Sequence, residues 1–186
     1  MKFILSIYVI LSFSSAQIYA EETRQVDKHE HGVGALNVAT EGDVIEFEFM
    51  IPGADIVGFE YVAKSDADIA SIKKALQTFE NYENIFTLPK NSRCQLTEKQ
   101  VALKEDEDDH DEHDDHDEHA EENHNEFYAK YSFECGDTKA INKVEFPYFS
   151  TFPNSGELEV QFISSIGSVS FEVEAEEPSI NIDGKI

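Results

Sequence analysis

The sequence predicts an α+β domain: mostly antiparallel β-structure in a sandwich-like sheet, with one packed helix and a long disordered loop. Several short segments alternate apolar and polar residues with a period of two, which is typical of strands with one buried face. Only residues 65–80 repeat apolar residues at helical spacing. Residues 104–126 are almost entirely Asp, Glu and His, and such a segment cannot bury enough apolar surface to fold.

Residues 1–20 have the layout of a secretory signal peptide. Lys2 precedes an apolar run, residues 3–13, that is too short for a stable membrane span. Cleavage is expected after Ala20, with a cut after Ala16 as the alternative. We therefore expect an exported protein whose mature chain, residues 21–186, forms a single domain with an insertion at 104–126.

The amino-terminal half of the mature chain predicts a hairpin. Residues 36–39 and 44–51 form its two strands, the turn lies around Gly42, and Pro52 ends the second strand because proline cannot continue a central ladder. One face of the second strand carries Ile45, Phe47, Phe49 and Ile51.

One helix follows this hairpin. Ser65 is its expected N-cap, and the helix should end near residues 80–82. Its predicted core-facing stripe consists of Ile69, Ile72, Leu76 and Phe79.

The rest of the chain predicts more strands. Residues 95–103 and 127–133 flank the insertion, and residues 158–162, 169–173 and 179–182 follow it. Prolines prevent residues 144–152 from forming a regular central strand. The total is about eight strands, which with one helix fits an α+β domain.

Two cysteines, Cys94 and Cys135, are expected to form a disulfide because the protein is exported. The bond would close a loop of roughly 40 residues at the base of the insertion, worth about 4 kcal/mol in chain entropy. A thiolate metal site is the alternative, although the sequence contains no Cys-x-x-Cys.

The insertion has the composition of a metal-binding tract. His110, His113, His116 and His119 recur at every third residue, and His124 follows them. Neutral imidazole is a ligand for Zn²⁺, Ni²⁺ and Cu²⁺, and acidic neighbours concentrate cations. We predict that the tract binds several ions, with Zn²⁺ favoured. The alternative is a solvated acidic loop without a metal.

A second candidate site precedes the first strand. In an extended chain, His29 and His31 point to the same side, so they could share one ion with a third ligand such as Asp27 or Glu60. The alternative is a pair of surface histidines near the chain terminus.

The formal net charge of −25 argues against a nucleic acid or an anionic membrane as partner, since both bind basic patches. A cation or a basic protein surface is compatible with it. An enzyme is not expected, because the sequence has neither Gly-x-Ser-x-Gly nor His-Glu-x-x-His. Three functions remain: a zinc-binding protein, a nickel or copper buffer for detoxification, and an acidic interaction protein with incidental metal binding.

A series of motifs in order resembles the ZrgA-type proteins over residues 29–182: HEHGVGALNVA, IPGADIVGFEYVAKSD, CQL, the His-rich insertion, YSFEC, FPYF, ELEVQFIS and VSFEVE. The resemblance implies a periplasmic zinc-binding protein that supports an ABC transporter and hands zinc to its solute-binding protein. It assigns His29, His31 and the histidines of the insertion as ligands. The family commonly has a histidine after Gly-Phe-Glu, where this chain has Tyr61, so the resemblance implies an ordered site that is weakened or rebuilt around Glu60.

Overall fold

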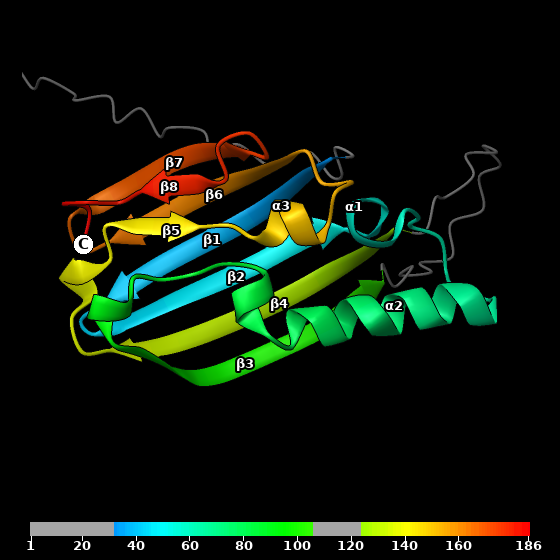
Figure 1. Ribbon diagram of the computed structural model, residues 1–186, viewed down its shortest axis with the longest axis horizontal. Helices are drawn as coiled ribbons and strands as arrows, with labels where there is room; N and C mark the ends of the chain where they lie inside the picture. Colours follow the sequence, from blue (N-terminus) through cyan, green and yellow to red (C-terminus); the bar gives the residue numbers. More distant parts are fainter. Residues whose placement is uncertain (1–31, 106–123) are drawn as a thin grey trace, which may run out of the picture.

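A single six-stranded sheet forms the frame of the protein (Figure 1). The computed structural model describes residues 32–105 and 124–186, so the predicted signal peptide lies outside the described residues. The strand order is β3-β4-β2-β1-β6-β7. The strands are β1 (Val33–Glu41), β2 (Val44–Pro52), β3 (Cys94–Glu105), β4 (Asn125–Cys135), β6 (Glu157–Ser164) and β7 (Gly167–Glu174).

The sheet is mostly antiparallel, as predicted, with one parallel pair. β1 pairs with β2 through the expected hairpin, whose Gly42 has the positive φ of 64° that the turn requires. β1 also pairs in parallel with β6. Parallel neighbours need a crossover connection. Here the whole chain between β1 and β6, residues 42–156, provides it.

A second layer covers one face of the sheet (Figure 1). It contains a two-stranded sheet and three α-helices within the described residues, so the prediction of a single helix was wrong by two short helices. Its elements are α1 (Gly53–Val57), α2 (Asp66–Phe79), α3 (Tyr148–Thr151), β5 (Lys143–Glu145) and β8 (Ser179–Asn181), with 3-10 turns at Tyr82–Asn84, Lys90–Ser92 and Thr138–Ala140. The architecture is α+β, and the covering layer is mainly helical rather than the second face of a sandwich.

Aromatic rings fill the space between the two layers. The ring centroids of Phe47 and Phe86 lie 4.2 Å apart, and Phe133 packs edge-on against Phe47 at 6.2 Å. The predicted alternation in β2 and β4 is confirmed, because the following side chains are all buried: Ile45, Phe47, Phe49, Ile51, Phe127, Ala129, Tyr131 and Phe133.

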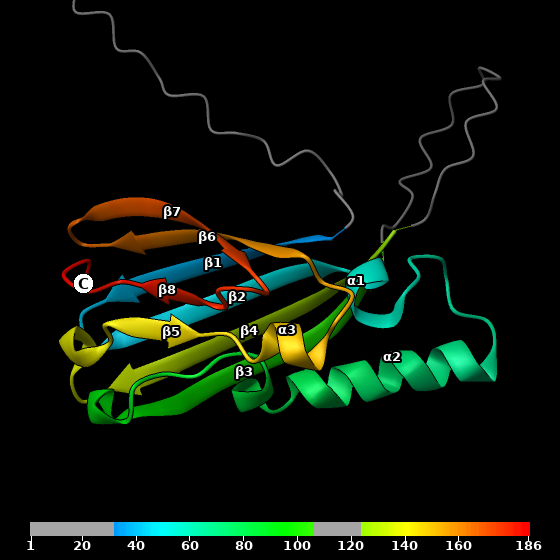
Figure 2. The same ribbon diagram turned by 45° about the horizontal axis from the view of Figure 1, so that its top comes forward.

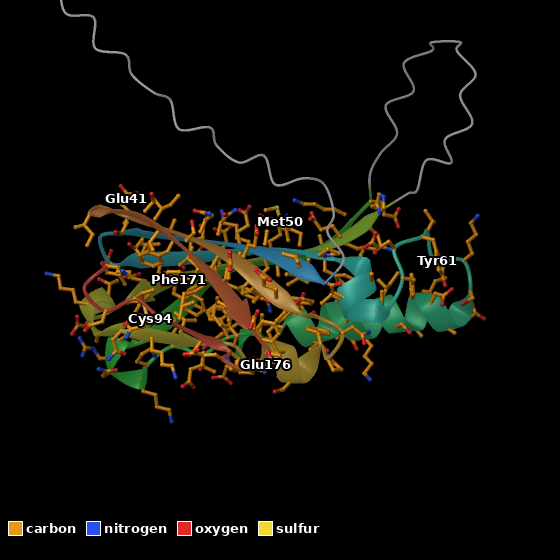
Figure 3. All side chains as sticks on the ribbon, turned by 90° about the horizontal axis from the view of Figure 1, so that it is seen from above. Glu41, Met50, Tyr61, Cys94, Phe171 and Glu176 are labelled. Atoms are coloured by element: carbon orange, nitrogen blue, oxygen red, sulfur yellow. A yellow bond between two sulfur atoms is a disulfide. The ribbon has the colours of Figure 1, made fainter. Side chains whose placement is uncertain are left out.

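Within the described residues, no helix or strand covers the opposite face of the sheet (Figure 3). Met50 points away from α3, β5 and β8 on this face, as the period of two along β2 requires. The alternating glutamates of β2, Glu46 and Glu48, lie on the same face. The sequence therefore alternates because only one side of the sheet is a core.

Helix α2 begins and ends where the sequence predicts. The Ser65 hydroxyl accepts a hydrogen bond from the Asp68 amide at 3.1 Å, which caps the first turn. At the other end, the Tyr131 hydroxyl donates to the carbonyl of Phe79 at 2.6 Å. The Phe79 ring stacks on Phe127 and Phe152, so the last turn of the helix is fixed to the sheet.

The first half of α2 extends beyond the sheet (Figure 2). Ile69 is 51% exposed, so its assignment to the core stripe was wrong, although Phe79 is fully buried. The helix keeps its apolar spacing where the sheet no longer covers it. No helix in the described residues is long and apolar enough to cross a membrane.

Cys94 and Cys135 form the predicted disulfide, but at the other end of the β3–β4 hairpin from the insertion. The two residues face each other at the start of the ladder, and Glu105 faces Asn125 at its end. At roughly 3.3 Å per residue, the disulfide lies about 35 Å from the insertion. The strands extend into both ends of the segment predicted as loop, and the Lys104 ammonium lies 3.7 Å from the Tyr128 ring centroid there. The base of the insertion is thus closed by the ladder.

Two buried tyrosines should make the stability of the protein sensitive to alkali. Burial raises the pKa of Tyr131 and of Tyr148 above the ordinary value of 10.0. Above pH ~10 the unfolded tyrosines lose protons that the folded ones keep. The free energy of unfolding therefore stays at its full value below that pH, as far as these two groups are concerned, and falls as the pH rises above it.

The measurement is denaturant unfolding between pH 8 and 11 for the natural protein and for Tyr131→Phe/Tyr148→Phe. Each tyrosine should contribute a slope of up to about 1.4 kcal/mol per pH unit, and the double variant should lose that slope. Tyr61→Phe is the matched control, because the Tyr61 side chain is 55% exposed. Equal slopes in the natural protein and the double variant would contradict this assignment.

Candidate metal centre

One end of the sheet gathers the segments that carry the predicted ligands (Figure 2). β3 ends here, β4 begins here, and α1 with the connection from α1 to α2 lies beside them. His124 immediately precedes β4 and closes the histidine-rich tract. Glu60 belongs to the connection between the two helices. The fold therefore brings together two predicted site residues that are 64 positions apart.

The side chains of His124 and Glu60 are in direct contact. The Nδ1 atom of His124 lies 2.6 Å from Oε2 of Glu60, slightly shorter than the roughly 2.7–2.9 Å that is usual for a charge-assisted N–H···O hydrogen bond. The Glu60 side chain is only 8% exposed and that of His124 is 23% exposed. A carboxylate so buried must be paired, because desolvating an isolated charge is costly.

Backbone hydrogen bonds hold the two segments at this distance. The amide of Asn125 donates to the carbonyl of Glu60 at 3.1 Å. The side-chain amide of Asn125 donates to the carbonyl of Tyr61 at 3.2 Å. Asn125 is 2% exposed, so both bonds are shielded from water. We call these two bonds and the His124–Glu60 contact the Asn125 clasp.

Gly53 makes room for the Asn125 clasp. A Cβ atom at Gly53 would lie 1.7 Å from Oδ1 of Asn125 and 2.7 Å from the carbonyl oxygen of Phe59. Any larger residue at the start of α1 would displace the asparagine. At the end of α1, Gly58 takes the left-handed conformation with φ 85°, which turns the chain toward Glu60. Both glycines of the Pro-Gly-Ala-Asp-Ile-Val-Gly stretch are thus needed for the site.

Two stacked rings flank Glu60. The Phe59 and Tyr61 ring centroids lie 4.7 Å apart. Tyr61 is 55% exposed and lies beside α2 at the far end of the molecule from Cys94 (Figure 3). Because Glu60 sits between the two stacked residues, its backbone is restrained on both sides.

The described chain begins at the same end of the sheet, directly after the amino-terminal histidines. Gly32, which follows His31, donates its amide to Oδ1 of buried Asp55 in α1 at 2.8 Å. In the sheet, Met50 of β2 pairs on one side with the β1 residue three positions after Gly32. On its other side it pairs with the β4 residue three positions after Asn125. Two strand spacings therefore separate Gly32 from Asn125, which is about 10 Å.

The predicted site residues divide into two groups. His124 and Glu60 are brought together as described, whereas the remaining ones lie outside the described residues: His29, His31, His110, His113, His116 and His119. Within residues 32–105 and 124–186, no three His, Cys, Asp or Glu side chains are arranged to hold a metal ion. The described part of the chain therefore offers a histidine and a carboxylate, and further ligands would have to come from the remaining segments.

The sequence reasoning missed Asn125 and Gly53. Asn125 stands at the end of a polar run, where an asparagine suggests only a loop or turn. Its burial depends on a loop that is distant in the sequence. The Pro52-Gly53 pair indicates only a strand end, and the close approach of Asn125 to that glycine has no local sequence pattern.

The donor atoms of this pair suit a borderline metal. An imidazole nitrogen binds Zn²⁺ at about 2.0–2.1 Å, and a carboxylate that hydrogen-bonds the other ring nitrogen is a common partner of such a ligand. The protein can thus present one oriented histidine at the point where the tract rejoins the sheet.

Substituting Gly53 by alanine should disrupt this arrangement. The new Cβ would overlap Oδ1 of Asn125, so overpacking should lower the free energy of unfolding by about 1–3 kcal/mol. Gly184→Ala is the control, since nothing lies within 4 Å of a Cβ there and only the strain of its positive φ remains. Urea unfolding measures both variants. A smaller loss for Gly53→Ala than for Gly184→Ala would show that the asparagine has room to move.

Comparison with known proteins supports a role in metal uptake. A search of curated proteins gives no match. The family model described as "ZrgA family zinc uptake protein" matches residues 28–182, which includes every described strand and helix. The chain therefore belongs to the ZrgA family of zinc uptake proteins.

Proposed function

We propose that this protein is exported to the periplasm, captures Zn²⁺ there and supports its uptake by an ABC transporter. The Asn125 clasp carries the proposal, because it holds His124 where the histidine-rich tract rejoins the sheet. Family membership supports zinc as the cargo. The function is binding and delivery rather than catalysis.

The two kinds of histidine have different tasks in this proposal. The four tract histidines supply capacity, since each can bind an ion weakly with help from neighbouring carboxylates. His124 supplies affinity, because a ligand already held in place loses less conformational freedom when it binds. An ion can then pass from the tract to the ordered site.

Covalent distances favour this transfer. His119 is five residues from His124, so its Cα lies at most about 18 Å away even in a fully extended chain. An ion held there remains at a high effective concentration near the ordered site.

The amino-terminal pair can complete the ordered site. The Cα of His31 is about 3.8 Å from that of Gly32, as in any trans peptide. Gly32 itself is anchored by Asp55 at the same sheet end as Asn125. We therefore propose His31, with His29 two residues before it, as further zinc ligands beside His124.

The partner that receives zinc is proposed to be the solute-binding protein of the transporter. A formal net charge of −25 favours contact with a basic surface on that partner. Steering by charge accelerates association and is weakened by salt.

The test is calorimetric titration of the mature, untagged, chelator-treated protein with Zn²⁺. Replacing the four tract histidines by asparagine should lower the number of ions bound but leave the tightest site. His124→Asn should keep the weak sites and weaken the tightest one at least ~10-fold, because even indirect changes at a zinc site cost 10–100-fold.

Competition with Ni²⁺ and Cu²⁺ in the same titration separates zinc capture from a buffer for those metals. The tract variant has a matched control in four Asp→Asn substitutions at 106, 108, 109 and 111, which change charge without removing imidazole. Unchanged zinc stoichiometry after removal of the tract histidines would contradict the role of the tract. If neither the natural protein nor any variant binds zinc, the proposed function as a whole is refuted.

A further inference from the structure

The contact between Glu60 and His124 gives the carboxylate a different task from the metal ligand that the sequence suggested. Oε2 of Glu60 lies 2.6 Å from Nδ1, the ring nitrogen nearer the backbone. An ionised carboxylate only accepts hydrogen bonds, so against ionised Glu60 the ring donates from a protonated Nδ1. In the neutral ring that binds metal, the lone pair is then on Nε2.

We propose that Glu60 is a positioning residue, which keeps the proton of His124 on Nδ1 so that Nε2 binds Zn²⁺. The inference rests on the proposed function, because it assigns the atom that makes the metal bond. It replaces direct coordination by Glu60 with a carboxylate–histidine–zinc arrangement, in which the carboxylate sets the tautomer and the orientation of the ring.

The surroundings of Glu60 oppose its movement to a metal. Its side chain is 8% exposed, whereas that of His124 is 23% exposed, so the histidine is the more accessible of the two. The backbone carbonyl of Glu60 accepts a hydrogen bond from the Asn125 amide, and the next carbonyl, that of Tyr61, accepts one from the Asn125 side chain. Two hydrogen bonds to one asparagine thus fix the backbone from which the carboxylate extends.

The same contacts fix the ring. His124 directly precedes Asn125, whose amide and side chain are both bonded to the Glu60–Tyr61 backbone. The backbone of the histidine and that of the glutamate are therefore held by one residue, and the side-chain contact adds a third bond between the same segments. A metal-binding ring held in this way is oriented before the ion arrives.

The nitrogen signals of the histidine rings test the proposal directly. The full mature protein, labelled with ¹⁵N-histidine, is titrated with Zn²⁺ and followed by long-range ¹H–¹⁵N correlation. His124→Asn identifies the signals of His124. We expect the Nε2 signal of His124 to shift on zinc binding, while Nδ1 keeps its bound proton.

The outcomes separate this inference from the proposed function. Metal binding at Nδ1, with the proton on Nε2, would overturn the positioning role and leave His124 as a zinc ligand. No change in either nitrogen of His124, while zinc binds elsewhere, would refute both the positioning role and the ordered site.

Variants of Glu60 supply the second measurement. Glu60→Ala should weaken the tightest zinc site 10–100-fold and mix the two tautomers of His124. Glu60→Gln keeps an oxygen that accepts from Nδ1, so it should preserve the tautomer and recover part of the affinity. Glu98→Gln, at an exposed position on β3, is the matched control and should change neither.

If Glu60 coordinates zinc itself, Glu60→Gln should lose as much affinity as Glu60→Ala while the tautomer stays unchanged, which would overturn the proposal. Backbone amide spectra of each variant show whether β4 and the helix connection remain folded. Glu60→Gln keeps the size of the side chain, so it serves as the test if Glu60→Ala unfolds.

Discussion

The buried asparagine at the start of β4 is the constraint on which the candidate site depends. Asn125 joins a strand of the sheet to the connection between α1 and α2 through its amide and its side chain. The preceding residue is thereby placed against Glu60, and the approach is possible because Gly53 has no side chain. A polar residue that is 2% exposed is costly to bury, and the hydrogen bonds that its backbone amide and side-chain NH2 donate to the loop offset part of that cost.

The two ends of the sheet differ in what they carry. At one end, the disulfide closes the β3–β4 hairpin. At the other end, the same hairpin opens into the histidine-rich tract, next to Glu60 and to the anchored Gly32. In the described part of the chain, the core of aromatic rings lies on a single face of the sheet, and no helix or strand covers the second face. Strands of the sheet thus lead directly into the segments that we propose to bind zinc.

Local sequence patterns predicted most of the fold, whereas contacts between residues far apart in the sequence could not be predicted from them. Alternation located the strands, and Ser65 located the start of α2, because both signals depend on neighbouring residues. The parallel β1–β6 pair, the five-residue α1 and the exposure of Ile69 depend on tertiary packing, which periodicity does not record. Cysteine number predicted the disulfide but not its distance from the tract. Residue type marks His124 and Glu60 as possible ligands, but their contact spans 64 positions and depends on the fold.

The central claim is that His124 is an ordered zinc ligand. The most direct measurement is the anomalous diffraction of zinc in crystals of the mature protein grown with Zn²⁺. The account predicts a zinc peak about 2.0–2.1 Å from Nε2 of His124, with Glu60 still bonded to Nδ1. Zinc peaks confined to other positions, with the ring of His124 bound only to protein or water, would contradict it.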